Sequence, residues 1–323
     1  MTRRELLLSA AAPLTAGRPA TKMGVATTSY ALRRASDPLG FLEYCHALGA
    51  GGVQLSLRGA DPKVFRAKAE EYGMWVEAFL SLPADEQAIK HAKDCGASTA
   101  RIAMLGGRRY ETFDALEPFQ QFAARSWRAL ELAEPMARKY RFGLAIENHK
   151  DWCVPEMVAM MKKISSEYVG VLVDTGNSIA LLEDPMGTVE AYAPYAMSTH
   201  IKDMGVEEHR DGFLLSEVAL GEGFLDLARI FQILAQAKPG LRFTLEMITR
   251  DPLQIPCLTP KYWATMPETP AQDLAAMLGL VRRNRSKKPL PRITGLSREQ
   301  QLEYEDQNVR QCLAYAKCCI LKA

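Results

Sequence analysis

The chain has 323 residues, of which 48% are hydrophobic, 24% charged and 8% aromatic. This composition is that of a folded globular protein and excludes intrinsic disorder and fibrous repeats. The formal charge is only +2 and no long basic run occurs, which argues against nucleic acid as a partner. No apolar run reaches the roughly 18 residues that a membrane-spanning helix requires.

The first twenty residues have the layout of an export signal. Arg3 and Arg4 precede an uncharged and mostly apolar run over residues 6–16. The arginine pair resembles the twin-arginine signal, with Leu6 where that motif usually has phenylalanine. We therefore predict export to the periplasm through a twin-arginine-like signal. An amphipathic N-terminal helix on a cytoplasmic protein is the alternative.

Short β-rich runs alternate with helical segments along the rest of the chain. The runs lie at residues 23–29, 52–57, 75–82, 99–105, 142–147, 169–174, 197–202 and 243–248. This alternation predicts parallel strands joined by helices. Eight such units favour a closed (β/α)8 TIM barrel of the α/β class over an open doubly wound sheet. No Gly-x-Gly-x-x-Gly motif follows the first run, which argues against a dinucleotide site.

Three regions are expected along the chain. Residues 1–20 are the predicted export signal, residues 21–283 form the barrel, and residues 284–323 form a linker and a terminal helix. A proline-containing loop is expected at residues 251–269. Ser297 followed by Gln300 predicts a capping box at the start of the terminal helix. That helix is expected either to pack on the barrel or to contact a second copy in a homo-oligomer.

Four successive predicted strands end in an acidic or imidazole side chain: Glu147, Asp174, His200 and Glu246. Side chains alternate between the faces of a strand, and each acid shares its face with small or polar residues. We expect the four to converge, because TIM-barrel active sites lie at the carboxyl ends of the strands. Three carboxylates repel one another unless a cation lies between them. Oxygen ligands with one histidine suit Mn²⁺, Mg²⁺ or Co²⁺, and Zn²⁺ is also open.

The segments around these residues, LAIENH, LVDTGN, STHIKD and FTLEM, resemble the xylose isomerase-like TIM barrel superfamily. They resemble in particular its sugar-phosphate isomerase/epimerase branch, which includes tagatose epimerases, hydroxypyruvate isomerases and inosose dehydratases. The resemblance implies one divalent metal bound by Glu147, Asp174, His200 and Glu246. It also implies that Glu147 and Glu246 are catalytic and carry protons on opposite faces of the substrate.

Such a site supports several reactions through one enediolate. A metal on a carbonyl and its neighbouring hydroxyl stabilises this species after a carboxylate removes the α-proton. Returning the proton to the other face epimerises the carbon, and returning it to the adjacent carbon isomerises the sugar. We expect an isomerase or epimerase of a ketose or keto-sugar. The alternative is a lyase or dehydratase on a 3-keto glycoside or inosose-like substrate.

Two further classes are weighed against an enzyme acting on sugars. A non-catalytic carbohydrate-binding protein is disfavoured by the complete set of four ligands. The superfamily also contains zinc-dependent apurinic endonucleases, whose site needs additional histidines. The chain has only five histidines, so DNA repair is disfavoured.

Three residues near the predicted ligands are candidate substrate contacts. His149 and Lys202 share the inward parity of Glu147 and His200, although a rim salt bridge or a surface position is the alternative for both. Ketose epimerases of the branch commonly have histidine three residues after the metal-binding aspartate, where this chain has Asn177. The amide of Asn177 hydrogen-bonds to a sugar hydroxyl but carries no proton at neutral pH.

The export prediction is tested by replacing both arginines, Arg3→Lys and Arg4→Lys. The variant is expected to stay in the cytoplasm at full length, because the twin-arginine pair is what the export machinery reads. Cell fractionation with sequencing of the N-terminus measures both outcomes. The wild-type periplasmic protein should begin near Gly17 or Thr21. Active wild-type protein in the cytoplasm with an intact Met1 would contradict export.

Overall fold

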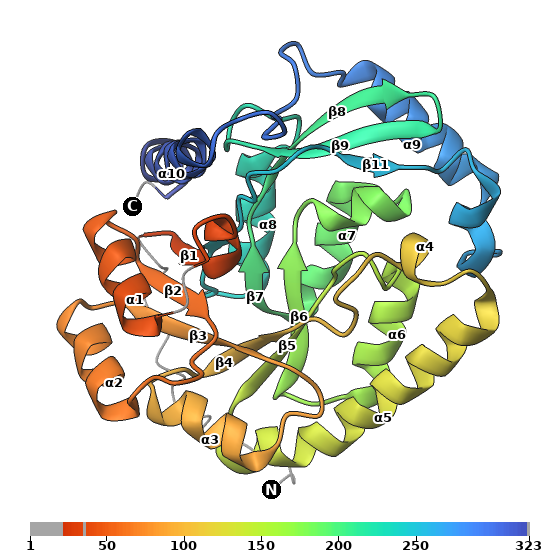
Figure 1. Ribbon diagram of the computed structural model, residues 1–323. Coiled ribbons are helices and arrows are strands. Elements are labelled where there is room, and N and C mark those ends of the chain that lie inside the picture. Colours follow the sequence, from red (N-terminus) through yellow and green to blue (C-terminus); the bar gives the residue numbers. More distant parts are fainter. Residues whose placement is uncertain (1–21, 35–36, 322–323) are drawn as a thin grey trace, which may run out of the picture.

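The computed structural model describes residues 22–34 and 37–321, so the predicted export signal lies outside the described residues. Eight parallel strands of the described chain form one sheet in the order β10-β1-β2-β3-β4-β5-β6-β7 (Figure 1). Its two edges meet, because the Ile201 N–H donates to the Thr244 carbonyl at 2.8 Å and the Glu246 N–H donates to the Ile201 carbonyl at 3.2 Å. The sheet closes into a barrel surrounded by helices, which confirms the predicted fold class.

Each barrel strand overlaps a run predicted from the sequence. The strands are β1 (Gly24–Ala26), β2 (Gly52–Leu55), β3 (Trp75–Leu80), β4 (Thr99–Ile102), β5 (Gly143–Glu147), β6 (Val169–Asp174), β7 (Ala196–His200) and β10 (Thr244–Leu245). The first and last are shorter than expected. After β1 the chain turns into a 3-10 helix at Thr27–Tyr30, and β10 forms ladder hydrogen bonds over two residues only.

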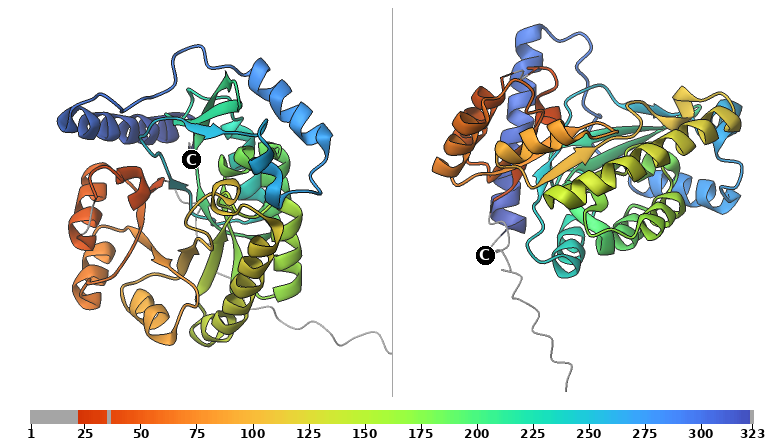
Figure 2. Two further views of the ribbon diagram at one scale, coloured as in Figure 1. Left: turned by 45° about the vertical axis from the view of Figure 1, so that its right-hand side comes forward. Right: turned by 90° about the horizontal axis from the view of Figure 1, so that it is seen from below.

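The helices lie around the outside of the barrel (Figures 1 and 2). They are α1 (Pro38–Ala47), α2 (Pro62–Glu71), α3 (Glu86–Asp94), α4 (Arg109–Thr112), α5 (Leu116–Tyr140), α6 (Val154–Ile164), α7 (Pro185–Tyr192), α8 (Leu227–Ala237), α9 (Ala271–Arg283) and α10 (Arg298–Tyr315). An Asp-Pro pair begins three of them. The side chains of Asp37, Asp61 and Asp184 accept hydrogen bonds from N–H groups of the first turn, and proline suits the first helical position. None of the described helices combines the length and apolarity that crossing a bilayer requires.

The apolar faces of the strands form the core between barrel and helices. Leu144 and Ile146 of β5 are fully buried in it. Val171 and Val173 of β6 belong to the same core. Because side chains alternate along a strand, this packing turns Glu147 and Asp174, the last residues of β5 and β6, toward the barrel interior. The hydrophobic contact with the helices therefore sets the direction of the carboxylates at the strand ends.

A second sheet beside the barrel was not predicted from the sequence. Strands β8 (Asp203–His209), β9 (Gly212–Val218) and β11 (Leu253–Ile255) form an antiparallel sheet in the order β11-β9-β8. It follows β7 directly and lies at the top of Figure 1. The segment 251–269, expected to be a loop, contributes β11 and the 3-10 helix η4 (Pro260–Thr265).

Helix α10 lies against the 3-10 helix at Thr27–Tyr30, which follows β1, and against β10 (Figure 2). Its predicted capping box of Ser297 and Gln300 is present. The buried Glu305 carboxylate accepts hydrogen bonds from the N–H groups of Leu32 and Arg33, at 2.6 and 3.1 Å. These contacts attach the last helix to the loop that follows β1. The predicted division at residue 283 and the predicted homo-oligomer stay predictions.

Candidate metal centre

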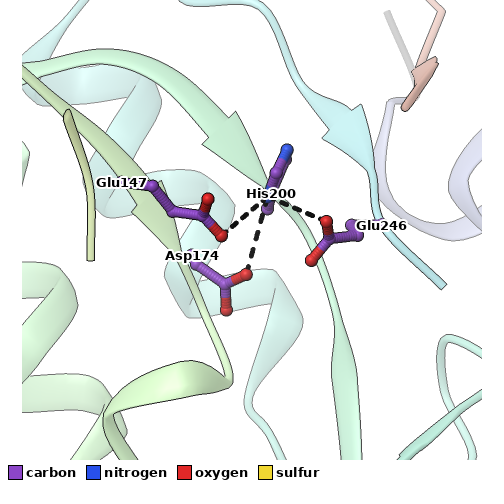
Figure 3. A group of neighbouring side chains, drawn as sticks. All are labelled: Glu147, Asp174, His200 and Glu246. Atoms are coloured by element: carbon purple, nitrogen blue, oxygen red, sulfur yellow. Dashed lines mark ion pairs between the residues drawn. The ribbon is translucent and has the colours of Figure 1, made fainter. Parts of the chain in front are cut away.

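Glu147, Asp174, His200 and Glu246 lie together at the carboxyl ends of β5, β6, β7 and β10 (Figure 3). One ligand atom of each lies within 4.8 Å of the others. The Nδ1 atom of His200 is 3.4 Å from an oxygen of Glu147, 3.4 Å from one of Glu246 and 3.7 Å from one of Asp174. The structure thus brings together the four residues that the strand-end pattern selected.

The ring of His200 is held from behind by buried polar side chains. Its Nε2 lies 2.6 Å from the Gln54 carbonyl oxygen, to which it donates. The Gln54 amide donates to a Glu77 oxygen at 2.9 Å, and the Ser198 hydroxyl donates to the same oxygen at 2.5 Å. In this orientation Nδ1 faces the carboxylates and has no hydrogen-bond partner among the described residues.

Each carboxylate uses its two oxygens differently. One oxygen faces His200, and the other has a separate partner. For Glu147 that partner is the Arg101 guanidinium, whose Nε lies 2.6 Å from Oε2. For Glu246 it is the Lys202 ammonium, 2.6 Å from Oε2. The Oδ1 atom of Asp174 accepts two backbone N–H bonds, both at 2.9 Å, from the turn after β6. These contacts fix all three carboxylates in orientation.

The electrostatics of the cluster follow from its burial and its alternating charges. Burial opposes ionisation of Glu147, but Arg101 and His200 outweigh it and lower the pKa of this carboxyl. His200 and Lys202 likewise lower the pKa of Glu246 against the effect of burial. Burial opposes protonation of His200, yet the three carboxylates raise the pKa of its imidazole well above the ordinary value. Without a metal ion, the positive charge that the three carboxylates require is therefore supplied by the proton on His200.

The donor set fits a divalent metal ion. Three buried carboxylates are directed at one point together with an imidazole nitrogen that has no hydrogen-bond partner within residues 22–34 and 37–321. Oxygen donors with a single histidine favour Mg²⁺, Mn²⁺ or Co²⁺ over metals that prefer thiolates. Glu147, Asp174, His200 and Glu246 are the residues that would hold the ion.

The three predicted substrate contacts lie close to this cluster. Lys202 is buried, and its ammonium contacts Asp174 at 2.9 Å as well as Glu246. Asn177 accepts a hydrogen bond from Lys202 at 3.3 Å and donates a long one of 3.4 Å to Glu147. The Nδ1 of His149 is buried and has no hydrogen-bond partner in the part of the chain that the structure describes. Burial lowers the pKa of this imidazole to about 4, although Glu147 opposes the shift. Their contact with substrate stays a prediction.

Several polar and charged residues of the site were not predicted from the sequence. Arg101 pairs in register with Ala145, so it points inward like Glu147 two residues further on. Gln54 and Glu77 are polar residues inside buried strands, and this is the signal that could have found them. Glu217 enters from β9, in the second sheet, and contacts Lys202 at 3.7 Å.

A cavity of about 960 Å³ has Arg101, the partner of Glu147, in its lining. It is lined by the carboxyl end of β3, the loops that follow β2 and β3, and helix α3. The Arg101 side chain is 18% exposed, whereas its partner Glu147 is fully buried. Arg101 therefore lies between this cavity and the candidate metal centre.

Residues 42–278 match the family described as xylose isomerase-like TIM barrel. The chain belongs to this family. A 3-oxo-isoapionate decarboxylase of Pectobacterium atrosepticum is 26% identical over 225 residues, which cover 65% of this chain and 79% of that protein.

Two solved structures share the fold. One is a xylose isomerase-like TIM barrel protein from Mycobacterium smegmatis in complex with magnesium, with a TM-score of 0.54, 16% identity, and coverage of 80% of this chain and 97% of the other. The second is a D-psicose 3-epimerase in the presence of D-fructose, with a TM-score of 0.61, 14% identity, and coverage of 93% and 100%.

Removing the support of His200 is expected to weaken metal binding. Gln54→Met removes the acceptor for the Nε2 proton, so the ring loses its fixed orientation. Metal affinity should fall about 10–100-fold, the usual effect of losing such a support. Titration of the metal-free protein with Mn²⁺ measures it. Ser198→Ala is the matched control, because it alters the same network but keeps the contact between Gln54 and His200. Equal affinities for Gln54→Met and wild type would contradict this role.

Metal uptake is expected to release about one proton near pH 7. The raised pKa of His200 keeps its imidazole protonated in the metal-free protein, whereas ligation requires a free Nδ1. The lowered pKa values of Glu147 and Glu246 mean that these ligands release none. Metal affinity should therefore fall about tenfold for each unit by which the pH is lowered. Calorimetry in buffers of different ionisation enthalpy counts the protons. A binding enthalpy that does not depend on the buffer would refute the assignment.

Proposed function

We propose that the protein is a divalent-metal-dependent isomerase or epimerase that acts on a ketose or keto-sugar through an enediolate. The observation that carries the proposal is the placement of two glutamates on opposite sides of one ligand atom. Glu147 and Glu246 each lie 3.4 Å from Nδ1 of His200 and approach it from opposite sides (Figure 3). Carboxylates placed in this way can remove a proton from one face of a carbon and return it to the other.

The residues of this chain divide the work of the reaction. When bound, a divalent metal supplies positive charge that stabilises the enediolate. Glu147 and Glu246 exchange protons with the substrate carbon. Arg101 and Lys202 orient them and keep them ionised, so that each begins as a proton acceptor. The Gln54 side chain keeps Nδ1 of His200 directed at the metal, and the burial of the cluster excludes water from the reacting atoms.

The relatives support enolisation as the shared step. The D-psicose 3-epimerase is a ketose epimerase by its name, and it shares the barrel over 93% of this chain. Loss of carbon dioxide from a 3-oxo acid, the reaction named for the Pectobacterium relative, also passes through an enolate. Proton transfer at a carbon beside a carbonyl is therefore the chemistry that we assign to the site.

The proposal predicts exchange of solvent deuterium into intact substrate. Ketohexoses and 3-keto glycosides incubated with the metal-loaded protein in D₂O should gain deuterium beside the carbonyl, as measured by NMR. Glu147→Gln and Glu246→Gln should lower the exchange rate about 10²–10⁴-fold, the usual contribution of a general base. Metal content is measured for both, because these residues are also the predicted ligands. Glu305→Gln, which alters a buried carboxylate of α10, is the matched control and should keep its activity.

A second candidate is a lyase that uses the same enolate. The observation that favours it is the buried ammonium of Lys202, 2.6 Å from Glu246, because a cation beside the proton carrier stabilises a departing anion. A 3-keto glycoside, an inosose-like substrate or a 3-oxo acid fits this reaction. The same NMR experiment separates the two candidates, since elimination gives an unsaturated product and decarboxylation gives carbon dioxide. Neither deuterium exchange nor such a product across the panel would overturn both.

A further inference from the structure

Lys150 is a buried cation that neither the cluster nor the proposed reaction uses. It follows β5, and its backbone carbonyl accepts a 2.8 Å hydrogen bond from the Arg109 N–H, which fixes its position. Lys150 is 3% exposed, and its ammonium donates to the amide oxygen of Asn177. No carboxylate of the described residues forms an ion pair with it. A buried ammonium with an amide as its partner is costly unless an anion joins it.

A second ammonium points at the same atom. The Nζ of Lys202 donates to the Asn177 amide oxygen at 3.3 Å. Two lysines on different loops thus converge on one uncharged oxygen, at the edge of the candidate metal centre. Burial, together with the charges of Lys202 and Arg250, lowers the pKa of Lys150 to about 8, as expected for a cation that lacks a counter-ion.

We propose that Lys150 and Lys202 bind a carboxylate of the substrate, so that the substrate is a keto-sugar acid. This inference rests on the proposed function for the location of the substrate. The two oxygens of a carboxylate can each take one ammonium, where the Asn177 oxygen now serves both. Because Lys202 also contacts Glu246, the substrate carboxylate would lie close to Glu246, the proposed proton carrier on one face of the substrate. The Asn177 oxygen is the acceptor that both ammonium groups share when no substrate is bound.

Equilibrium binding of an unreactive pair of probes tests the assignment. D-gluconate and D-glucitol have matching carbon chains and differ at the carboxylate, and neither has a carbonyl group to enolise. Calorimetry on the metal-loaded protein should show that gluconate binds at least tenfold more tightly than glucitol. Lys150→Met should abolish this preference, and Lys150→Arg should keep most of it. Lys90→Met is the matched control, because Lys90 is an exposed lysine that lines the neighbouring cavity.

Two outcomes of this experiment would overturn the proposal. If Lys150→Met keeps the preference, gluconate binds through the metal or another cation. If glucitol 6-phosphate binds more tightly than gluconate in a manner that depends on Lys150, the pocket takes a phosphate. Lys150→Gln is the second variant should Lys150→Met fail to fold, with metal content and thermal unfolding as checks. Failure of the proposed function is distinguishable, because it would show as absent deuterium exchange while the gluconate preference persisted.

Discussion

Closure of the barrel between β7 and β10 is the constraint on which the site depends. In the order of the sheet, His200 and Glu246 belong to strands at opposite edges. Two backbone hydrogen bonds at Ile201, to Thr244 and from Glu246, join these edges and make the two side chains neighbours. An open sheet with the same strands would keep Glu246 far from Glu147 and Asp174. The opposed pair of glutamates therefore exists only in the closed barrel.

Closure also concentrates negative charge, and the chain offsets it in three different ways. Glu147 is held by a guanidinium, Asp174 by two backbone N–H groups, and Glu246 by an ammonium. These partners take the oxygens that face away from His200, and Lys202 also contacts the Asp174 oxygen that faces His200, at 2.9 Å. The inward oxygens of Glu147 and Glu246 are left for a metal or a proton, because among the described residues their only ion pair is with His200. A carboxylate bound through both oxygens could neither ligate an ion nor accept a proton. Because only one oxygen of each glutamate is taken, the other stays available either to ligate an ion or to accept a proton.

The sequence was most informative where a strand has one apolar and one polar face. The parity of Leu144, Ile146 and Glu147 placed the acid on the inward face, because burying the two apolar side chains leaves no other orientation. The same parity held for β6. The hairpin of β8 and β9 was missed, although Asp211-Gly212 lies at its turn, because the runs were assigned only to alternating strands and helices.

Polar residues inside strands were harder to interpret. Gln54, Glu77 and Arg101 lie far apart in sequence from the residues that they contact, so no local pattern shows their partners. A buried glutamine or glutamate in a strand signals a polar contact but not its identity. Ligand residues were predictable because they occupy equivalent places on successive strands. Their supports were not, because each contact depends on the register of distant strands around the closed barrel.

The four ligands define the ion site but leave the choice of substrate to the surrounding loops. Asn177 illustrates how one position can affect both the ion site and the choice of substrate. A histidine there, as is common in ketose epimerases of the branch, would offer a proton carrier beside two ammonium groups. Protonation of such a histidine would be opposed by Lys150 and Lys202, whose charges are already close together. An asparagine oxygen instead accepts hydrogen bonds from both lysines and allows the cations to stay buried. An asparagine in place of a proton-carrying histidine and a second buried lysine are therefore parts of one electrostatic arrangement. This arrangement favours an anionic group on the substrate over an additional acid or base on the protein.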